Sequence, residues 1–509
     1  MHLDRNRLKT LTAARLAGMR RGIEKESLRI DDAGRLASTP HPAALGSALT
    51  HPQITTDFSE SQLELITGAR LRPADTLDEL RRVHQFVYRH LGDELLWTSS
   101  MPCDLPADEH DIPLGRYGSS NVATAKTVYR AGLSWRYGRR MQTISGIHYN
   151  WSLPGLSTDD YFALIRNFRR HSFLLLLLFG ASPALAASFG AAQGLQPLGD
   201  HTHYLPHATS LRMGRLGYQS DAQSSLCVSY NCLDTYAASL HDALTRPYPA
   251  YEAIGLQGPD GEWRQLSTTL LQIENEFYGT IRPKRTIRPG ERPLHALRDR
   301  GVEYVEVRCM DLNPFVDIGI DEPTTRLLDV FLLHCVLTDS PNDTPGEIAE
   351  LAHNQQTVAA RGREPGVTLR RAGEDVPLQA WATELLQQFG VIAELLDAWE
   401  GGHRYGAALD AAQAALQAPH TLPSARVVQA LEAGRSHRDF ALACSRQARE
   451  ALLALPWSVQ DEAGFAASAQ TSLAEQAAIE VADTESFAEY RARYVAAEKL
   501  GQAPALHGC

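Results

Sequence analysis

The sequence lacks the short motifs by which many nucleotide-binding and hydrolytic enzymes can be recognised. No Gly-Lys pair occurs in its 509 residues, which excludes a P-loop, and neither HExxH nor GxSxG is present. A zinc protease helix and a nucleophile elbow are therefore not predicted. Any nucleotide has to be held through metal ions and dispersed cations, among which Lys126, Lys284 and Arg285 are candidates. Each of the three could equally be an ordinary surface cation.

Cysteine and lysine are both scarce. The seven Cys are odd in number and form no CxxC pair, which argues against a disulfide framework or a zinc knuckle and favours a reducing, cytoplasmic location. Only five residues are Lys, and the formal net charge is −11. General nucleic-acid binding requires a basic face, so this charge argues against that class of function.

A long apolar segment suited to a membrane span is also missing. Residues 172–199 contain no charged side chain and Phe173–Phe179 is wholly apolar, but Gly180 and Pro183 interrupt the run after about two helical turns. We therefore predict a buried core helix rather than a membrane helix. The first 16 residues have no long apolar core, so no secretory signal is expected.

The length and the hydrophobic content of 44% are typical of a globular protein with about two to four domains. Over the first three quarters of the chain, strand-like runs alternate with turns and helices. We predict strands at Ser61–Thr67, Thr143–Leu153 and Val302–Met310, helices at Thr76–Leu91 and Thr158–Leu178, and a loop from Arg282 to Pro293.

The character of the chain changes after about residue 376. Ala, Leu and Gln dominate there, and apolar residues recur at helical spacing in Leu378–Phe389, Ala407–Leu416, Ser436–Ala454 and Glu475–Ala497. We predict an all-helical region whose role is packing, because it carries few residues suited to catalysis.

Carboxylates stand in two strand-like segments, where alternate residues share a face. Glu24 and Glu26 lie two residues apart and would point the same way. Glu64 lies between two Leu residues inside an apolar strand, and Asp57 lies on the preceding turn. Neighbouring or buried carboxylates are unfavourable unless a cation lies between them, and their oxygens suit Mg²⁺. An exposed acidic edge and a strand with one hydrated face remain the alternatives.

Two further strands carry a histidine and an arginine beside polar partners. His148 and Asn150 would share one face of their strand, and an imidazole can bind a metal or a phosphate. Glu306 and Arg308 would also share a face, where a carboxylate and a guanidinium could hold a metal and a phosphoryl group together. A structural histidine and a cross-strand ion pair are the alternatives.

Seven long segments follow one another over roughly residues 20–340: GIEKESLRI, HPAALGSALTHPQITTDFSESQLELIT, MQTISGIHYNWSLP, LFGASPA, YLPHATSLRMGRLGY, LQIENEFYGTIRPKR and GVEYVEVRCMDLNPF. In this order they resemble the proteobacterial type of glutamate–cysteine ligase, also called γ-glutamylcysteine synthetase. The helical region after residue 376 resembles the family more loosely. One departure is His207, where the family pattern has Tyr; it lies outside the metal ligands that the resemblance implies.

The resemblance implies an α+β fold with an antiparallel β-sheet funnel like the catalytic core of glutamine synthetase, over residues 1–375, and a helical region over residues 376–509. It also implies ATP and three divalent ions, Mg²⁺ or Mn²⁺, at the centre of the funnel. The implied metal ligands are Glu24, Glu26, Asp57, Glu64, His148 and Glu306. Arg308 matches the arginine that addresses the transferring phosphate, and the residues that resemble substrate contacts are Phe58, Tyr129, Arg212, Tyr218 and Tyr278.

The activity that the resemblance implies is the ATP-dependent ligation of the γ-carboxylate of L-glutamate to the amine of L-cysteine, the first step of glutathione biosynthesis. A γ-glutamyl phosphate would be the intermediate, so no protein nucleophile is needed and no Cys need be catalytic. No nucleic acid, membrane or obligatory protein partner is expected. The alternatives are a relative that ligates glutamate to ammonia or a polyamine, and a metal-binding protein that keeps the fold without turnover.

Overall fold

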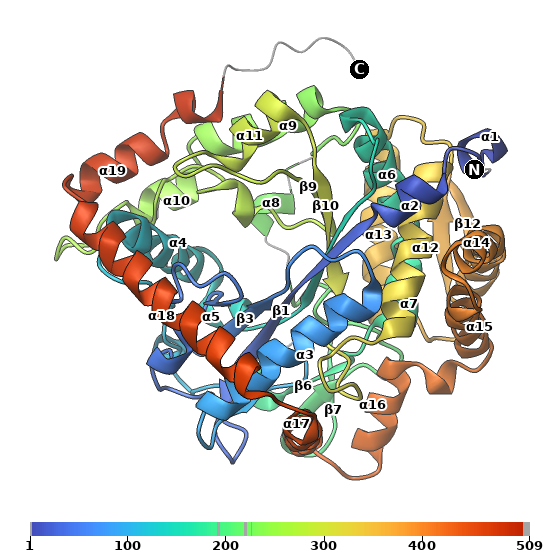
Figure 1. Ribbon diagram of the computed structural model, residues 1–509, viewed down its shortest axis with the longest axis horizontal. Helices are drawn as coiled ribbons and strands as arrows, with labels where there is room; N and C mark the ends of the chain where they lie inside the picture. Colours follow the sequence, from blue (N-terminus) through green and yellow to red (C-terminus); the bar gives the residue numbers. More distant parts are fainter. Residues whose placement is uncertain (1–2, 191–193, 218–220, 225, 227, 502–509) are drawn as a thin grey trace.

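The computed structural model describes residues 3–190, 194–217, 221–224, 226 and 228–501. Its centre is a sheet in the strand order β2-β3-β1-β5-β10-β9, with a short strand β4 also paired to β1 (Figure 1). Every neighbouring pair is antiparallel, which confirms a mixed fold of helices and an antiparallel sheet. The strands are β1 (Arg20–Ile30), β2 (Ile54–Thr56), β3 (Gln62–Ile66), β4 (Leu95–Leu96), β5 (Ile147–Ser152), β9 (Ile281–Lys284) and β10 (Tyr304–Met310).

The three strands predicted from alternating residues are confirmed as β3, β5 and β10, with shorter bounds. β5 begins at Ile147 rather than at Thr143, because Thr143 caps the short helix α5 (Arg139–Gln142). Gly146 then precedes the strand, and a Cβ there would lie only 2.0 Å from a guanidinium nitrogen of Arg212. The absence of a side chain at Gly146 therefore lets Arg212 approach the sheet.

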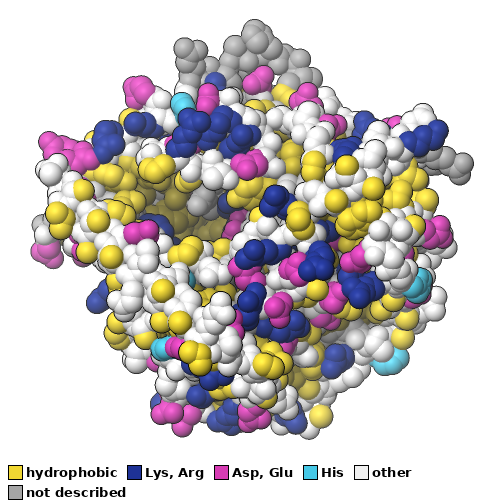
Figure 2. Space-filling model, in the orientation of Figure 1, with side chains coloured by type: hydrophobic (Ala, Val, Ile, Leu, Met, Phe, Trp, Pro, Cys, Tyr) yellow, Lys and Arg dark blue, Asp and Glu magenta, His cyan; other side chains and the backbone are white. Residues whose placement is uncertain are grey.

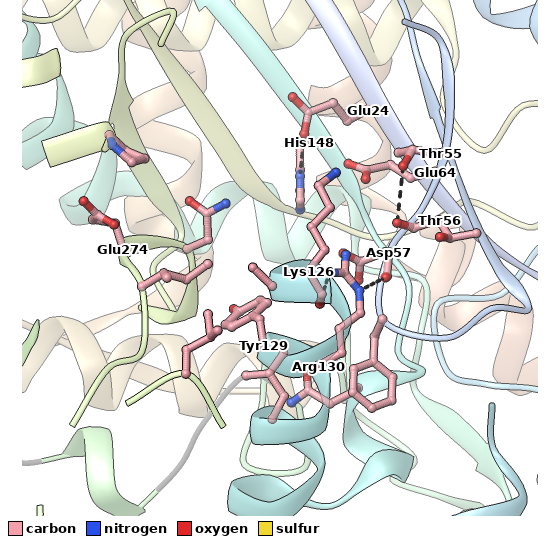
Figure 3. Close-up of a pocket in the computed structure, with 18 of the residues that line it drawn as sticks. Glu24, Thr55, Thr56, Asp57, Glu64, Lys126, Tyr129, Arg130, His148 and Glu274 are labelled. Atoms are coloured by element: carbon pink, nitrogen blue, oxygen red, sulfur yellow. Dashed lines mark hydrogen bonds and ion pairs between the residues drawn. The ribbon is translucent and has the colours of Figure 1, made fainter. Parts of the chain in front are cut away.

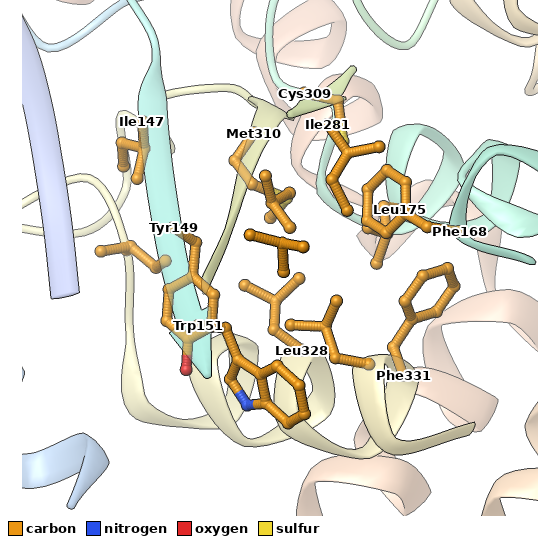
Figure 4. Packing of buried hydrophobic residues seen from close by; sticks show 14 of the residues in the cluster. Ile147, Tyr149, Trp151, Phe168, Leu175, Ile281, Cys309, Met310, Leu328 and Phe331 are labelled. Carbon is orange, nitrogen blue, oxygen red and sulfur yellow. The ribbon is translucent and has the colours of Figure 1, made fainter. Parts of the chain in front are cut away.

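One face of the sheet is covered by the helices α6 (Thr158–His171), α7 (Phe173–Phe179) and α12 (Glu322–Leu337). Figure 4 shows apolar side chains of the sheet and of these helices facing one another; those it labels are Ile147, Tyr149, Trp151, Phe168, Leu175, Ile281, Cys309, Met310, Leu328 and Phe331. Burying this face leaves the polar residues at alternate positions on the opposite face of the sheet.

The apolar run Phe173–Phe179 forms α7, and the first six of its residues are buried, which confirms the predicted core helix. Gly180 is its C-cap, and a Cβ there would lie 2.5 Å from the carbonyl oxygen of Leu176, which favours glycine at this position. The single helix predicted over Thr158–Leu178 is wrong, because Ser172 separates α6 from α7. Within the described residues, no helix has both the length and the apolar character that crossing a membrane requires.

The segment predicted as a loop from Arg282 begins instead as strand β9. Its residues pair with β10 from Lys284 opposite Tyr304 to Ile281 opposite Val307. β9 is the edge strand of the sheet, so Pro283 can stand in it although it has no N–H to donate. The remainder, up to the start of α11 (Pro293–Arg300), is a loop as predicted.

From residue 378 to residue 501 the chain contains helices and no strand, as expected. Its α-helices are α14 (Leu378–Glu400), α15 (Arg404–Gln417), α16 (Pro423–Glu432), α17 (His437–Ala454), α18 (Val459–Ala482) and α19 (Phe487–Tyr494). The helical stretch predicted over Glu475–Ala497 is therefore parts of two helices, α18 and α19, separated at residues 483–486.

These C-terminal helices pack against the earlier part of the chain. α14 and α15 contact α12, α17 and α18 contact α3 (Pro73–His90), and α19 contacts α4 (Asn121–Tyr137). Figure 1 shows α18 and then α19 running along the outside of the molecule. The helix predicted over Thr76–Leu91 is confirmed as α3, whereas the domain boundary at residue 375 stays a prediction.

The described cysteines are of two kinds. Those that are free and buried are Cys103, Cys309, Cys335 and Cys444. Cys232 is disulfide-bonded. This single bond, which the cysteine pattern did not predict, is not a framework of several disulfides.

Candidate active site

Polar residues from the central strands gather on the face of the sheet that α6 and α12 leave uncovered. Directly opposed residues of antiparallel strands share a face. Glu24 of β1 lies opposite His148 of β5. Glu26, two residues further along β1, lies opposite Glu64 of β3. Glu306 continues the same face on β10, so the four clusters found in the sequence meet at one place.

These side chains line a cavity of about 450 Å³. Figure 3 shows Glu24, His148 and Glu64 on one side of it, with Lys126 and Tyr129 reaching in from α4. Figure 2 shows that the face of the molecule drawn there is hollowed left of its centre, between the positions of α4 and β9 in Figure 1, and that apolar side chains border the hollow. The cavity therefore combines a charged floor with partly apolar walls.

His148 lies at the centre of the carboxylates. Its Nδ1 is 3.1 Å from an oxygen of Glu24 and 3.8 Å from one of Glu306. Its Nε2 is 3.7 Å from an oxygen of Glu26. The ligand atoms of Glu24, Glu64 and His148 all lie within 4.8 Å of one another. The buried Nε2 of His148 has no hydrogen-bond partner among the described residues, so it is available to a ligand.

The carboxylates between β1 and β3 repel one another. Burial and the neighbouring charge of Glu24 raise the pKa of Glu64 well above its ordinary value. Burial and the charge of Asp57 raise the pKa of Glu26 to about 8. These groups therefore resist ionisation as long as no cation lies among them.

The β10 end of the cluster is electropositive instead. Lys284 Nζ lies 3.1 Å from one oxygen of Glu306, and the guanidinium of Arg308 lies 3.2 Å from the other. Burial alone would raise the pKa of Glu306, but these two cations outweigh it and hold that pKa well below its ordinary value. Burial and Arg308 lower the pKa of His148, which favours the neutral imidazole that can bind a metal.

This set of donors fits hard divalent cations. It consists of carboxylate oxygens and one neutral imidazole nitrogen, which suit Mg²⁺ or Mn²⁺ better than a soft metal. A cation among them would relieve the repulsion around Glu64 and would offer a partner to Nε2 of His148.

Several cations surround the carboxylates. Lys126 and Lys284 line the cavity, as their selection from the sequence suggested. Arg285 does not, because its guanidinium donates to the carbonyl of the last residue of α11 and to that of Gly301, the C-cap of this helix. Arg130 and Arg282 also line the cavity and were not singled out. Only their spacing in the sequence could have indicated them. Arg130 lies one helical turn after Lys126, and Arg282 lies two strand residues before Lys284, so each shares a face with a candidate cation.

The residues predicted to contact the substrates differ in their position relative to the cavity. Phe58, Tyr129 and Tyr278 line the cavity. Arg212 is buried, and its Nη2 donates to a backbone carbonyl of β10 at 2.9 Å, so it is not one of the residues that line the cavity. Tyr218 lies outside the described residues.

Comparison with known proteins identifies the family. Residues 6–358 match the family model described as glutamate-cysteine ligase. The chain belongs to the glutamate–cysteine ligase family. Among curated relatives in this family, the glutamate–cysteine ligase of Azotobacter vinelandii is 52% identical over 499 residues, which cover 93% of this chain and 94% of the relative. That of Pseudomonas aeruginosa strain PAO1 is 50% identical over 496 residues, with the same coverage of both chains.

Solved structures agree with this assignment to the glutamate–cysteine ligase family. The glutamate–cysteine ligase of Francisella tularensis, determined in complex with AMP, matches with a TM-score of 0.90 and 35% identity and covers 94% of this chain and 98% of that one. A bifunctional glutathione synthetase from Pasteurella multocida shares the fold, with a TM-score of 0.72 and 24% identity over 92% of this chain and 58% of that one.

The match to the glutamate–cysteine ligase family model ends at residue 358, but the cavity extends further. Tyr490 and Tyr494 of α19 also line it. The sequence of this region predicted a packing role alone, so both residues were missed. Their spacing of four residues is a signal for a shared helix face, although it does not reveal what that face contacts.

Proposed function

We propose that this cavity joins glutamate to cysteine by way of a γ-glutamyl phosphate. Family membership assigns to the chain the ATP-dependent formation of γ-glutamylcysteine, the first step of glutathione synthesis. The AMP bound to the Francisella relative supports nucleotide binding by this chain. The observation that carries the proposal is that Glu24, Glu26, Glu64, His148 and Glu306 converge on one face of the sheet.

Divalent cations are part of the proposal. The residues that would hold Mg²⁺ or Mn²⁺ are Glu24, Glu26, Asp57, Glu64, His148 and Glu306. When bound, such ions supply positive charge to the phosphates of ATP. Arg308 lies beside this cluster with a planar fork of donors, which suits it to the phosphoryl group in transfer.

The chemistry follows from the poor reactivity of a carboxylate, whose leaving group would be oxide or hydroxide. An oxygen of the glutamate γ-carboxylate attacks the γ-phosphorus of ATP, the bond from that phosphorus to the bridging oxygen breaks, and ADP leaves. The neutral amine of cysteine then attacks the acyl carbon, the bond to the phosphate oxygen breaks, and phosphate leaves with the electron pair. The amine nitrogen gives up one proton to a carboxylate or phosphate oxygen, which leaves the neutral amide. The chain positions the reactants and stabilises charge, and none of its residues forms a covalent bond.

The walls of the cavity suit a small second substrate. Phe58, Tyr129 and Tyr278 present aromatic rings that could enclose a thiol side chain and exclude a charged one. The proposal also includes a funnel like that of glutamine synthetase around the sheet, and the cytoplasmic location expected from the cysteine content.

An assay of ADP release tests the proposal. With glutamate and ATP, we expect release to depend on cysteine and γ-glutamylcysteine to appear by mass spectrometry. Ammonia and spermidine replace cysteine as control amines. Equal rates with a control amine would contradict the assignment of cysteine, and no product with any amine would contradict the ligase activity.

The number of metal ions is tested by titration. Because the carboxylates outnumber those needed for one Mg·ATP complex, we expect the rate to keep rising as free Mg²⁺ is added above a fixed Mg·ATP concentration, before it saturates. The full rate without excess metal would contradict a site for several ions.

A further inference from the structure

The end of the cavity away from the carboxylates is apolar and includes the C-terminal helix α19. Ala125 and Leu266 form a small hydrophobic cluster against which Ile273, Tyr490 and Tyr494 pack, and all five residues line the cavity. Figure 3 places Glu274, next to Ile273 in the chain, on the side opposite Asp57, with Lys126 and Tyr129 between them in this view. The cavity is thus charged at one end and apolar at the other.

The two tyrosines form an aromatic wall. Their rings are separated by 5.9 Å between centroids and inclined by only 11°. The guanidinium of Arg292 lies 4.9 Å from the ring centroid of Tyr494, and Arg292 is itself held by an ion pair with Glu274 at 2.6 Å. Both tyrosines remain partly exposed, so each ring keeps apolar surface that the protein does not cover.

A further apolar residue of the cavity is also exposed. Ile287, in the loop that leads from β9 to α11, lines the cavity and is 49% exposed. It lies three residues after Lys284, whose ammonium group reaches Glu306 in the carboxylate cluster. A path therefore runs from the apolar end, past a cation, to the carboxylates.

We infer that Tyr490 and Tyr494 of α19, together with Ile287, form the subsite for the purine ring of ATP, so that the C-terminal helix completes the active site. The inference rests on the proposed function, because that reaction brings a nucleotide triphosphate into this cavity. A purine is flat, aromatic and weakly polar, as the apolar end requires, while its triphosphate needs the cations and metal ligands at the other end. The glutamate and cysteine side chains have no comparable ring.

The test uses full-length Tyr490→Ala and Tyr494→Ala enzymes, with Phe487→Ala as the matched control. Phe487 lies on the same helix and packs on Trp263 with ring centroids 5.2 Å apart, but it does not line the cavity. We expect each tyrosine variant to raise the KM for ATP about tenfold, as loss of base–aromatic stacking does. The KM values for glutamate and cysteine should stay unchanged, and Phe487→Ala should leave all three KM values near those of the wild type.

Inhibitors that carry a purine or only phosphates distinguish the purine subsite from the phosphate subsite. The tyrosine variants should weaken inhibition by AMP about tenfold, but they should leave inhibition by inorganic tripolyphosphate unchanged. If the variants do not fold, irradiation of the wild-type enzyme with 8-azido-ATP should label the peptide that contains residues 487–494.

Three results would overturn the inference: an unchanged KM for ATP in both tyrosine variants, an equal increase in Phe487→Ala, or labelling confined to other peptides. In each case a wild-type enzyme that still makes γ-glutamylcysteine would leave the proposed function standing. A wild-type chain that makes no γ-glutamylcysteine from ATP, glutamate and cysteine would instead contradict the proposed function itself.

Discussion

At the scale of single residues, the buried carboxylates differ in what they contribute to stability. Glu64 is surrounded by Glu24, Glu26 and Asp57, all of which raise its pKa. Glu79 is also buried, but it accepts two hydrogen bonds from Arg70, at 2.7 and 2.8 Å. Glu64 is therefore buried in spite of repulsion by its neighbours, whereas Glu79 is stabilised by an ion pair. Replacement by Gln should affect the stability of the protein in opposite ways at the two positions.

Glu64→Gln should abolish most activity without loss of stability. If Glu64 is a metal ligand, its loss removes charge stabilisation at the phosphoryl group, and turnover should fall about 10²-fold or more. Because the amide removes like-charge repulsion, the melting temperature of the metal-free protein should stay equal or rise. Turnover and thermal unfolding measured on the same preparation decide the matter, and near-normal turnover would remove Glu64 from the metal site.

Glu79→Gln is the matched control for that substitution. It breaks the ion pair with Arg70, and a hydrogen bond to a charged group contributes about 1.5–3 kcal/mol. The melting temperature should therefore fall while turnover per folded molecule stays near that of the wild type. A stable Glu79→Gln protein with low turnover would contradict this separation of roles.

Arg308 contacts both Glu306 and His148, at 3.2 and 3.4 Å, so it could either serve the phosphoryl group or only hold the sheet together. If it acts on the transition state, Arg308→Ala should lower turnover about 10²–10³-fold with little change in KM. Arg308→Lys should restore only part of the rate, because Lys lacks the planar fork. An Arg308→Ala enzyme that loses thermal stability but keeps its turnover would show the purely structural role.

At the scale of elements, strands with alternating residues could be predicted from the sequence, whereas their partners could not. The period of two in Glu24 and Glu26, or in Glu306 and Arg308, states which side chains share a face within one strand. It does not state that β1 lies between β3 and β5, because strand pairing is decided by contacts far apart in the sequence. The resemblance to a known family implied that these residues meet at one site, but it did not supply the order of the strands.

The errors in element prediction have local causes. β9 was missed because Pro283 signals a loop, and an edge strand tolerates a proline that a central strand would not. α6 and α7 were joined into one helix because no Gly or Pro stands between them, so the sequence gives no sign of the break at Ser172. Arg282 was overlooked as a cavity residue because the segment around Pro283 was predicted as a loop.

A buried ion pair links four elements. Arg21 of β1 donates to Asp329 of α12 at 2.7 Å, and the hydroxyls of Tyr149 on β5 and Tyr405 on α15 donate to the same carboxylate. Asp329→Ala would leave the guanidinium of Arg21 buried and unpaired, and the free energy of unfolding should fall by about 3–5 kcal/mol. Urea unfolding monitored by circular dichroism measures this change.

The control for that experiment is an ion pair at the surface. Arg35 and Asp31 lie 2.8 Å apart, but the Arg35 side chain is 70% exposed. Arg35→Ala should therefore change the free energy of unfolding by less than about 1 kcal/mol. An equally small effect of Asp329→Ala would mean that the buried pair does not hold these elements together.

At the scale of the whole molecule, the composition predicted the helical region correctly but not its relation to the rest. The change of character after residue 376 suggested a separate packing region. In the structure, Phe389 of α14 packs its ring 5.9 Å from that of Phe331 on α12, and Tyr405 of α15 reaches Asp329. Contacts of this kind between distant segments leave no pattern in either segment alone.

These contacts predict that residues 1–375 do not fold when expressed without the rest. Removing α14 and α15 would expose the apolar side of α12, and each large apolar side chain contributes about 1.5–3 kcal/mol when fully buried. Phe331, Phe389, Leu385 and Leu396 are all buried in the same core, and a whole domain is stable by only about 5–15 kcal/mol. The loss of a few such contacts is therefore comparable with the whole stability available. Calorimetry of the fragment should show no cooperative transition, and it should bind a hydrophobic dye that the full chain does not bind. A sharp transition near the melting temperature of the full chain would instead establish residue 375 as a domain boundary, and the helices beyond it would then be an appendage to an independently stable core.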